Sequence, residues 1–132
     1  MKTLIGALAV LLFSISALAE DGWSYVAGND DMQMSGKHGS FQRIKNKAGQ
    51  DVFVILGKGV NTRTKQVDLE KWYVRAADCA RQQGKLVTLT IDGEYKYEND
   101  FVFGAGTIAS GMAEFICGID AAVKQNNNKK GV

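Results

Sequence analysis

Short alternations of apolar and polar residues dominate the chain after residue 22. Residues 23–27 place Trp23, Tyr25 and Ala27 on one side of an extended segment, which breaks at residues 28–30. The apolar pair Met32 and Met34 follows with the same period, ahead of a turn expected at residues 35–39. Because side chains alternate between the two faces of a strand, this pattern predicts short strands.

Two hairpins are predicted further along the chain. Residues 41–45 and 51–56 are strand-like and surround a turn near Ala48-Gly49. Residues 85–91 and 94–103 flank Asp92-Gly93, a pair favoured in two-residue type I′ turns. The second half of the chain therefore contains at least one antiparallel strand pair.

A helix is predicted as the last element. Thr107 or Gly106 can cap its start, and Lys124 is followed by a polar run that predicts a disordered tail over residues 125–132. Its apolar residues recur at three- and four-residue steps and are Ile108, Met112, Phe115, Ile116, Ile119 and Val123.

Residues 68–83 fit two structures. Leu69, Trp72 and Ala76 belong to a helical period, for which Asp68 would be the cap. Trp72, Val74 and Ala76 also alternate as a strand would. The pattern leaves helix and strand open here.

The N-terminus has the layout of a secretory signal peptide over residues 1–19. Lys2 precedes a short apolar run, and Ala17-Leu18-Ala19 forms a small-x-small cleavage site. A membrane-spanning helix is the alternative, but serines break the run before the roughly 20 apolar residues that a span needs. No cysteine follows the cleavage site, so we expect no lipid attachment. The expected product is soluble and exported, either periplasmic or secreted, with no membrane insertion after cleavage.

Length and charge then limit the number of domains and the classes of partner expected for residues 20–132. This length is typical of a single domain, which we expect to span residues 20–124 with an α+β fold. The net charge falls from +2 to +1 once Lys2 leaves with the signal peptide. Such a neutral chain has no overall field to attract nucleic acid, so recognition of a partner would be local.

The two cysteines, Cys79 and Cys117, are expected to form a disulfide. An exported chain with two cysteines allows a single pairing, whereas free thiols serving a metal or a redox reaction would be expected with a C-x-x-C motif or several histidines. His38 is the only histidine.

No catalytic, metal or cofactor site is predicted. The segment from Gly104 to Ala109 matches the dinucleotide-binding pattern G-x-G-x-x-A, but no acidic residue follows about twenty positions later. A turn that opens a helix explains it equally well. His38 lies among turn residues without a cysteine partner, and the neighbouring acids Asp30-Asp31 and Glu98 to Asp100 fit neither an EF-hand nor an acid–base pair across a cleft.

A basic strip and a set of aromatics are the candidate contact residues. Arg43, Lys45 and Lys47 alternate, so they could form a strip for an anionic partner, although a solvated sheet face is the simpler interpretation. Arg63 and Lys65 repeat the pattern. The aromatics are equally a contact surface or the core, and they are Tyr25, Trp72, Tyr73, Tyr95 and Tyr97.

The second half of the chain resembles the surface-adhesin protein E family, small envelope proteins of Gram-negative bacteria. The resemblance is carried by the segments Lys71 to Cys79 (KWYVRAADC), Gly84 to Leu86, Asp92-Gly93, Asn99 to Val102, Gly106 to Ser110 (GTIAS) and Glu114 to Cys117 (EFIC). It implies an antiparallel sheet packed by a C-terminal helix, with Cys79 and Cys117 joining the sheet region to that helix. It also implies a role in adhesion, since the family's named member attaches to host matrix and serum proteins.

We therefore expect a non-enzymatic binding protein with a protein partner and no cofactor. The alternative is a periplasmic inhibitor or immunity protein that blocks a cell-wall hydrolase, because size, solubility and a disulfide suit both roles. Assembly as a homodimer is open.

Overall fold

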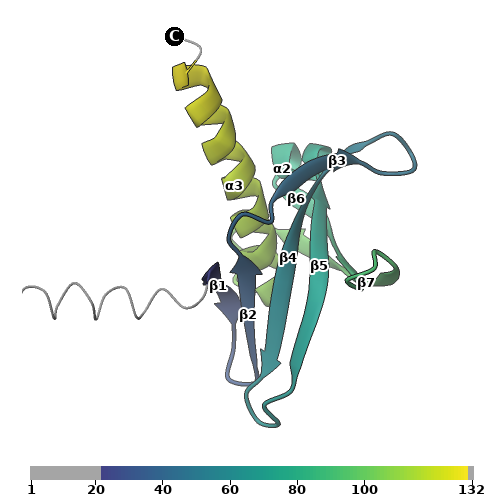
Figure 1. The fold of residues 1–132 in the computed structure, drawn as a ribbon, viewed down its shortest axis with the longest axis vertical. Helices are drawn as coiled ribbons and strands as arrows, with labels where there is room; N and C mark the ends of the chain where they lie inside the picture. The colour runs from purple at the N-terminus through teal and green to yellow at the C-terminus, as the bar shows by residue number, and fades with distance from the viewer. Residues whose placement is uncertain (1–21, 131–132) are drawn as a thin grey trace, which may run out of the picture.

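The computed structural model describes residues 22–130, and the side chains of residues 22–126; the predicted signal peptide lies outside the described residues. Seven strands form one antiparallel sheet, and a long C-terminal helix packs against it (Figure 1). The strands are β1 (Trp23–Gly28), β2 (Met32–Lys37), β3 (Gln42–Lys45), β4 (Asp51–Asn61), β5 (Val67–Arg75), β6 (Gln83–Leu89) and β7 (Tyr95–Val102); the helices are α2 (Ala76–Arg81) and α3 (Ile108–Lys130). The predicted α+β fold is confirmed.

β4 is the central strand of the sheet, whose order is β1-β2-β4-β5-β6-β7. Along one edge β4 pairs first with β3 and then with β2, and along its other edge it pairs with β5. β1 and β7 are the two outer strands. The β3–β4 and β6–β7 hairpins predicted from the sequence are both present.

One face of the sheet packs against α3 and forms the core. Buried strand side chains from β2, β4, β5, β6 and β7 meet buried residues of the helix. The strand residues are Met34, Phe53, Ile55, Trp72, Val74, Leu86 and Phe101, and the helix residues are Met112, Ala113 and Ile116. The predicted apolar period of the helix therefore identifies its packed face, except at Val123, which is 41% exposed.

Trp72 is the largest fully buried side chain, and a glycine makes room for it. A Cβ atom at Gly57 on β4 would lie 2.4 Å from the indole ring, so only glycine fits beneath the ring. The indole Nε1 donates a hydrogen bond of 2.8 Å to Oε1 of the buried Glu70, whose Oε2 lies 3.2 Å from Nζ of Lys96. The polar groups around the ring are thus paired.

The predicted disulfide is confirmed. Cys79 in α2 bonds Cys117 in α3, with a Cα–Cα distance of 5.6 Å. Since α2 directly follows β5, this bond ties the last helix to the end of a central strand.

Asp78 forms a second tie beside the disulfide. Its fully buried carboxylate accepts hydrogen bonds from Nε of Arg75 at 3.1 Å, from Arg81, and from the backbone N–H of Lys85 at 3.2 Å. Burial by itself would raise the pKa of this carboxyl, but the bonds from Arg81 and the Lys85 N–H and the charge of Arg75 hold the pKa below its ordinary value. A Cβ at Gly84 would lie 2.2 Å from the Asp78 Cγ, so glycine is needed at the start of β6.

Residues 68–83 contain both structures that the sequence allows. The chain is a strand up to Arg75 and a helix from Ala76. Leu69, which belongs to the helical period, is 46% exposed, whereas Trp72 and Val74 face the core. Asp68, considered as a helix cap, lies within β5.

The turn predicted at residues 35–39 is wrong in its bounds, because β2 continues to Lys37. Gly36 does not mark a turn. It lets the helix approach the sheet, since a Cβ there would lie 3.1 Å from Cε2 of Phe115.

The type I′ turn predicted at Asp92-Gly93 is also wrong, although its hairpin is right. The backbone N–H of Thr90 donates to the Glu94 carbonyl (2.7 Å) and that of Gly93 donates to the Thr90 carbonyl (2.9 Å), which closes a three-residue loop. Gly93 has a φ of 92°, but Asp92 does not have the positive φ that type I′ requires. The turn near Ala48-Gly49 has the same pattern, with Asn46 and Gln50 as its closing pair.

The N-terminal cap of α3 is Thr107, which is one of the two residues predicted for this role. Its Oγ1 accepts a hydrogen bond of 3.1 Å from the backbone N–H of Ser110. The helix continues to Lys130, beyond Lys124, where the sequence predicts that the ordered chain ends. A polar composition predicted fraying here, but a helix that is already nucleated can extend through polar residues.

Candidate functional site

The face of the sheet turned away from α3 carries exposed apolar side chains. On β5, Leu69, Lys71 and Tyr73 alternate with the buried residues Glu70, Trp72 and Val74. Side chains alternate between the faces of a strand, so the first three lie on the far side of the sheet from the core. We call this side the open face. Large exposed apolar patches on soluble proteins mark interaction sites.

A groove lies on the open face between the turns of the two hairpins. It has a volume of about 840 Å³. The turn at residues 46–48 lines one side and Gly93 and Glu94 line the other. Its remaining lining residues are Gln42, Ile44, Lys45, Val54, Lys71, Tyr73, Leu89 and Tyr95, and we call the whole the hairpin groove.

The floor of the hairpin groove is apolar because of strand register. Tyr73 on β5 pairs with Val54 on β4, and Lys71 pairs with Leu89 on β6. Residues that face each other across neighbouring antiparallel strands lie on the same face. The three neighbouring strands β4, β5 and β6 thus place aliphatic and aromatic side chains next to one another.

Three lysines and a single acid give the groove its charge. Lys45, Lys47 and Lys71 line it together with Glu94. The Lys45 ammonium lies 2.8 Å from Oδ1 of Asp51, whose pKa it lowers through a hydrogen bond, with a further hydrogen bond from Arg43. Within residues 22–126, neither Lys47 nor Lys71 has an ion-pair partner. The groove therefore presents unpaired positive charge beside apolar surface.

The predicted basic strip is divided between two sites. Lys45 and Lys47 line the hairpin groove, with Lys47 in the turn rather than on a strand. Arg43 turns to the helix side, where its guanidinium lies 5.4 Å from the centre of the Phe53 ring and 3.9 Å from Asp120 on α3. Arg63 pairs with Asp31 at 2.8 Å, away from the groove.

The predicted aromatic set is also divided. Trp72 is core, while Tyr25, Tyr95 and Tyr97 are exposed. Tyr95 is held in place by a hydrogen bond of 3.2 Å from its hydroxyl to Oε1 of Glu98. Its pKa is raised by desolvation and by the negative charge of Glu98.

The candidate catalytic residues do not assemble into a reaction site. His38 is exposed and its Nε2 is hydrogen-bonded to Oγ of Ser24, but no carboxylate orients the ring in the part of the chain that the structure describes. Asp31 pairs with Arg63, and Glu98 and Asp100 both face Lys85. Within residues 22–126 no group of three histidine, cysteine or acidic side chains could hold a metal ion.

The glycine motif at residues 104–109 is a turn. Gly104 and Gly106 have φ values of 80° and 77°, a region that favours glycine. The strand before them, β7, is antiparallel to β6, whereas a dinucleotide site requires parallel strands.

No family model, no curated protein and no solved structure matches the chain. Over residues 22–130, no helix has the length and apolar character needed to cross a membrane.

Proposed function

We propose that the protein is a non-enzymatic exported binding protein of the adhesin E type, and that its partner docks in the hairpin groove. One observation carries the proposal: an apolar groove with two unpaired lysines lies on a sheet face that α3 leaves open. Interface cores are apolar and rich in aromatic residues, with charged groups at the rim. The groove has this composition.

The charge of the groove specifies the partner's surface. Lys47 and Lys71 would meet carboxylates, while Tyr73, Tyr95 and Leu89 would meet apolar side chains. The complementary surface is an acidic protein segment that also carries apolar residues. Complementary charges of this kind speed association and select the partner.

The resemblance to adhesin E proteins suggests where such a partner occurs. The fold that it implies, an antiparallel sheet with a helix tied to it by Cys79 and Cys117, is the fold of this chain. Host matrix and serum proteins are therefore the first candidates. A cell-wall hydrolase of the envelope is the second, because two hairpin turns that project beside a groove also suit an inhibitor.

Charge reversal in the groove is expected to weaken binding by about tenfold, or about 1.4 kcal/mol. The variant Lys47→Glu/Lys71→Glu replaces two attractive contacts by repulsive ones. Binding of the purified oxidised protein to immobilised vitronectin, laminin and a lysozyme is measured by surface plasmon resonance at low and high salt. Affinity of the unaltered protein should fall at high salt, and that of the variant should change less.

The control is Arg63→Glu/Lys65→Glu, which changes the net charge equally in the loop between β4 and β5. Its affinity should stay within about twofold, as expected of residues outside an interface. Equal loss in the two double variants would place binding outside the groove. Absence of saturable binding to all three probes would refute the proposed function.

A further inference from the structure

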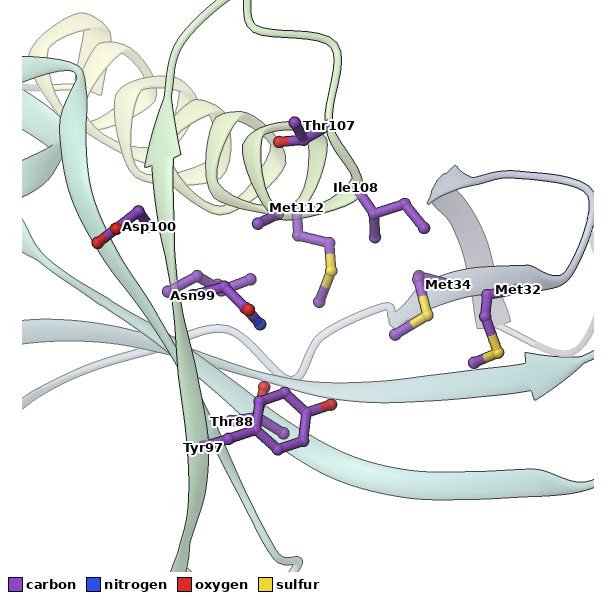
Figure 2. Close-up of a pocket in the computed structure, with 11 residues that line it drawn as sticks. Met32, Met34, Thr88, Tyr97, Asn99, Asp100, Thr107, Ile108 and Met112 are labelled. Carbon is purple, nitrogen blue, oxygen red and sulfur yellow. The ribbon is translucent and has the colours of Figure 1, made fainter.

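A second cavity lies on the helix side of the sheet, at the start of α3. It has a volume of about 450 Å³ and lies between β2, β6, β7 and the first turns of the helix. Figure 2 shows Met112 descending from the helix, Met32 and Met34 extending from β2, and Tyr97 and Asn99 on the opposite wall. We call it the methionine cavity. Its other lining residues are Leu86, Thr88, Asp100, Thr107, Ile108 and Ala109.

The methionines of the chain gather at this one place. Apart from Met1, the sequence contains three, and all three line the methionine cavity. Met32 and Met34 are two residues apart on one strand, while Met112 comes from a helix far away in the sequence. The fold thus brings together thioethers from opposite walls.

A glycine beneath the cavity makes room for the two strand methionines. Met34 Sδ and Met32 Cε lie 3.4 and 3.7 Å from the position of a Cβ at Gly59 on β4. The two side chains therefore pack over the bare backbone of Gly59, in the space that a larger residue would take. Methionine has three rotatable bonds and readily adapts its shape.

We propose that the methionine cavity binds a soft monovalent cation, Cu(I), through the thioethers of Met32, Met34 and Met112. Thioether sulfur selects Cu(I) over harder ions, which prefer carboxylate or water ligands. The competing soft ligands are elsewhere: both cysteines are in the disulfide, and His38 is not among the lining residues. The oxygens of Tyr97, Asn99 and Thr107 at the cavity wall are uncharged and hard, so they do not compete for Cu(I).

The ion binds without a change in oxidation state. Three neutral sulfurs leave the site with the +1 charge of the ion. The Asp100 carboxylate at the rim pairs with Lys85, so it does not enter the coordination sphere. Binding requires the three methionines to turn their sulfurs toward one ion, which the three rotatable bonds of each side chain allow.

Titration of the purified oxidised full chain with Ag(I), the redox-stable analogue of Cu(I), tests the site. Isothermal calorimetry should show one equivalent bound. Met34→Leu and Met112→Leu should each weaken binding by more than about tenfold, since removing even an outer-shell partner of a metal typically has that effect. Leucine conserves volume, so circular dichroism should show both variants folded.

The control is Ile108→Val, which alters the same wall without removing sulfur and should leave Ag(I) affinity within about twofold. A second readout is oxidation by hydrogen peroxide followed by mass spectrometry, in which bound Ag(I) should protect all three methionines. Failure of the unaltered protein to bind Ag(I), or unchanged binding in both leucine variants, would overturn the proposal. The methionine cavity is separate from the hairpin groove, so a negative result for one proposal does not decide the other.

Discussion

Replacing Trp72 by alanine should lower the free energy of unfolding by about 3–5 kcal/mol, the usual cost of truncating a buried aromatic residue. The side chain is 0% exposed, and it lies directly over Gly57 on β4. Its loss opens a cavity in the centre of the sheet and removes the indole bond to the buried Glu70. Urea denaturation followed by circular dichroism measures the change.

The chain provides its own control in Trp23, its second tryptophan. Trp23 lies on the outer strand β1, only partly buried, with Lys58 over its ring at 4.7 Å. Trp23→Ala should therefore cost less than half as much as Trp72→Ala. Equal losses in the two variants would show that the sheet core is not organised around Trp72.

Removing the disulfide should lower the free energy of unfolding by about 4 kcal/mol, from the chain entropy of the 38-residue separation between its cysteines. The Cys79→Ala/Cys117→Ala variant leaves no unpaired thiol. In addition to the entropic effect, α3 loses its covalent tie to α2. The difference in urea midpoint between the oxidised protein and this variant, taken with the slope of each transition, gives the free energy.

Reduction of the unaltered protein provides the internal check. Dithiothreitol should lower its stability to near that of the alanine variant, and it should not affect the variant itself. A loss below about 1 kcal/mol would mean that the apolar core, without the covalent bond, holds α3 in place.

Local patterns in the sequence predicted which strands and helices form better than they predicted where each one ends. The alternation of Leu69 to Val74 and the helical spacing of Leu69 to Ala76 overlap in one segment, and burial of Trp72 decided where the strand ends. Gly36 lies among residues typical of turns and therefore suggested one. In the structure it instead makes room for Phe115, which approaches the sheet from α3. Contacts between residues far apart in the sequence determine where such strands and turns end, and a single sequence does not show those contacts.

The hairpin groove could be predicted only in part. Lys45 and Lys47 were singled out as part of a basic strip for an anionic partner, and both line the groove, whereas their neighbour Arg43 does not. Lys71 and Leu89 were missed because their adjacency depends on the register between β5 and β6. The alternation of Lys71 and Tyr73 was the available signal, and it was obscured by the competing helical period.

A pair of matched tyrosine variants tests the central claim, that a protein partner binds in the hairpin groove. Tyr95 lines the groove and Tyr25 lies on β1 outside it, yet both side chains are 61% exposed. Affinity is measured for whichever of vitronectin, laminin and lysozyme binds the unaltered protein. Tyr95→Ala should weaken that binding by about tenfold or more, as expected of an aromatic residue central to an interface, while Tyr25→Ala should leave it within about twofold. A larger loss with Tyr25→Ala, or no loss with Tyr95→Ala, would contradict the placement of the binding site in the hairpin groove.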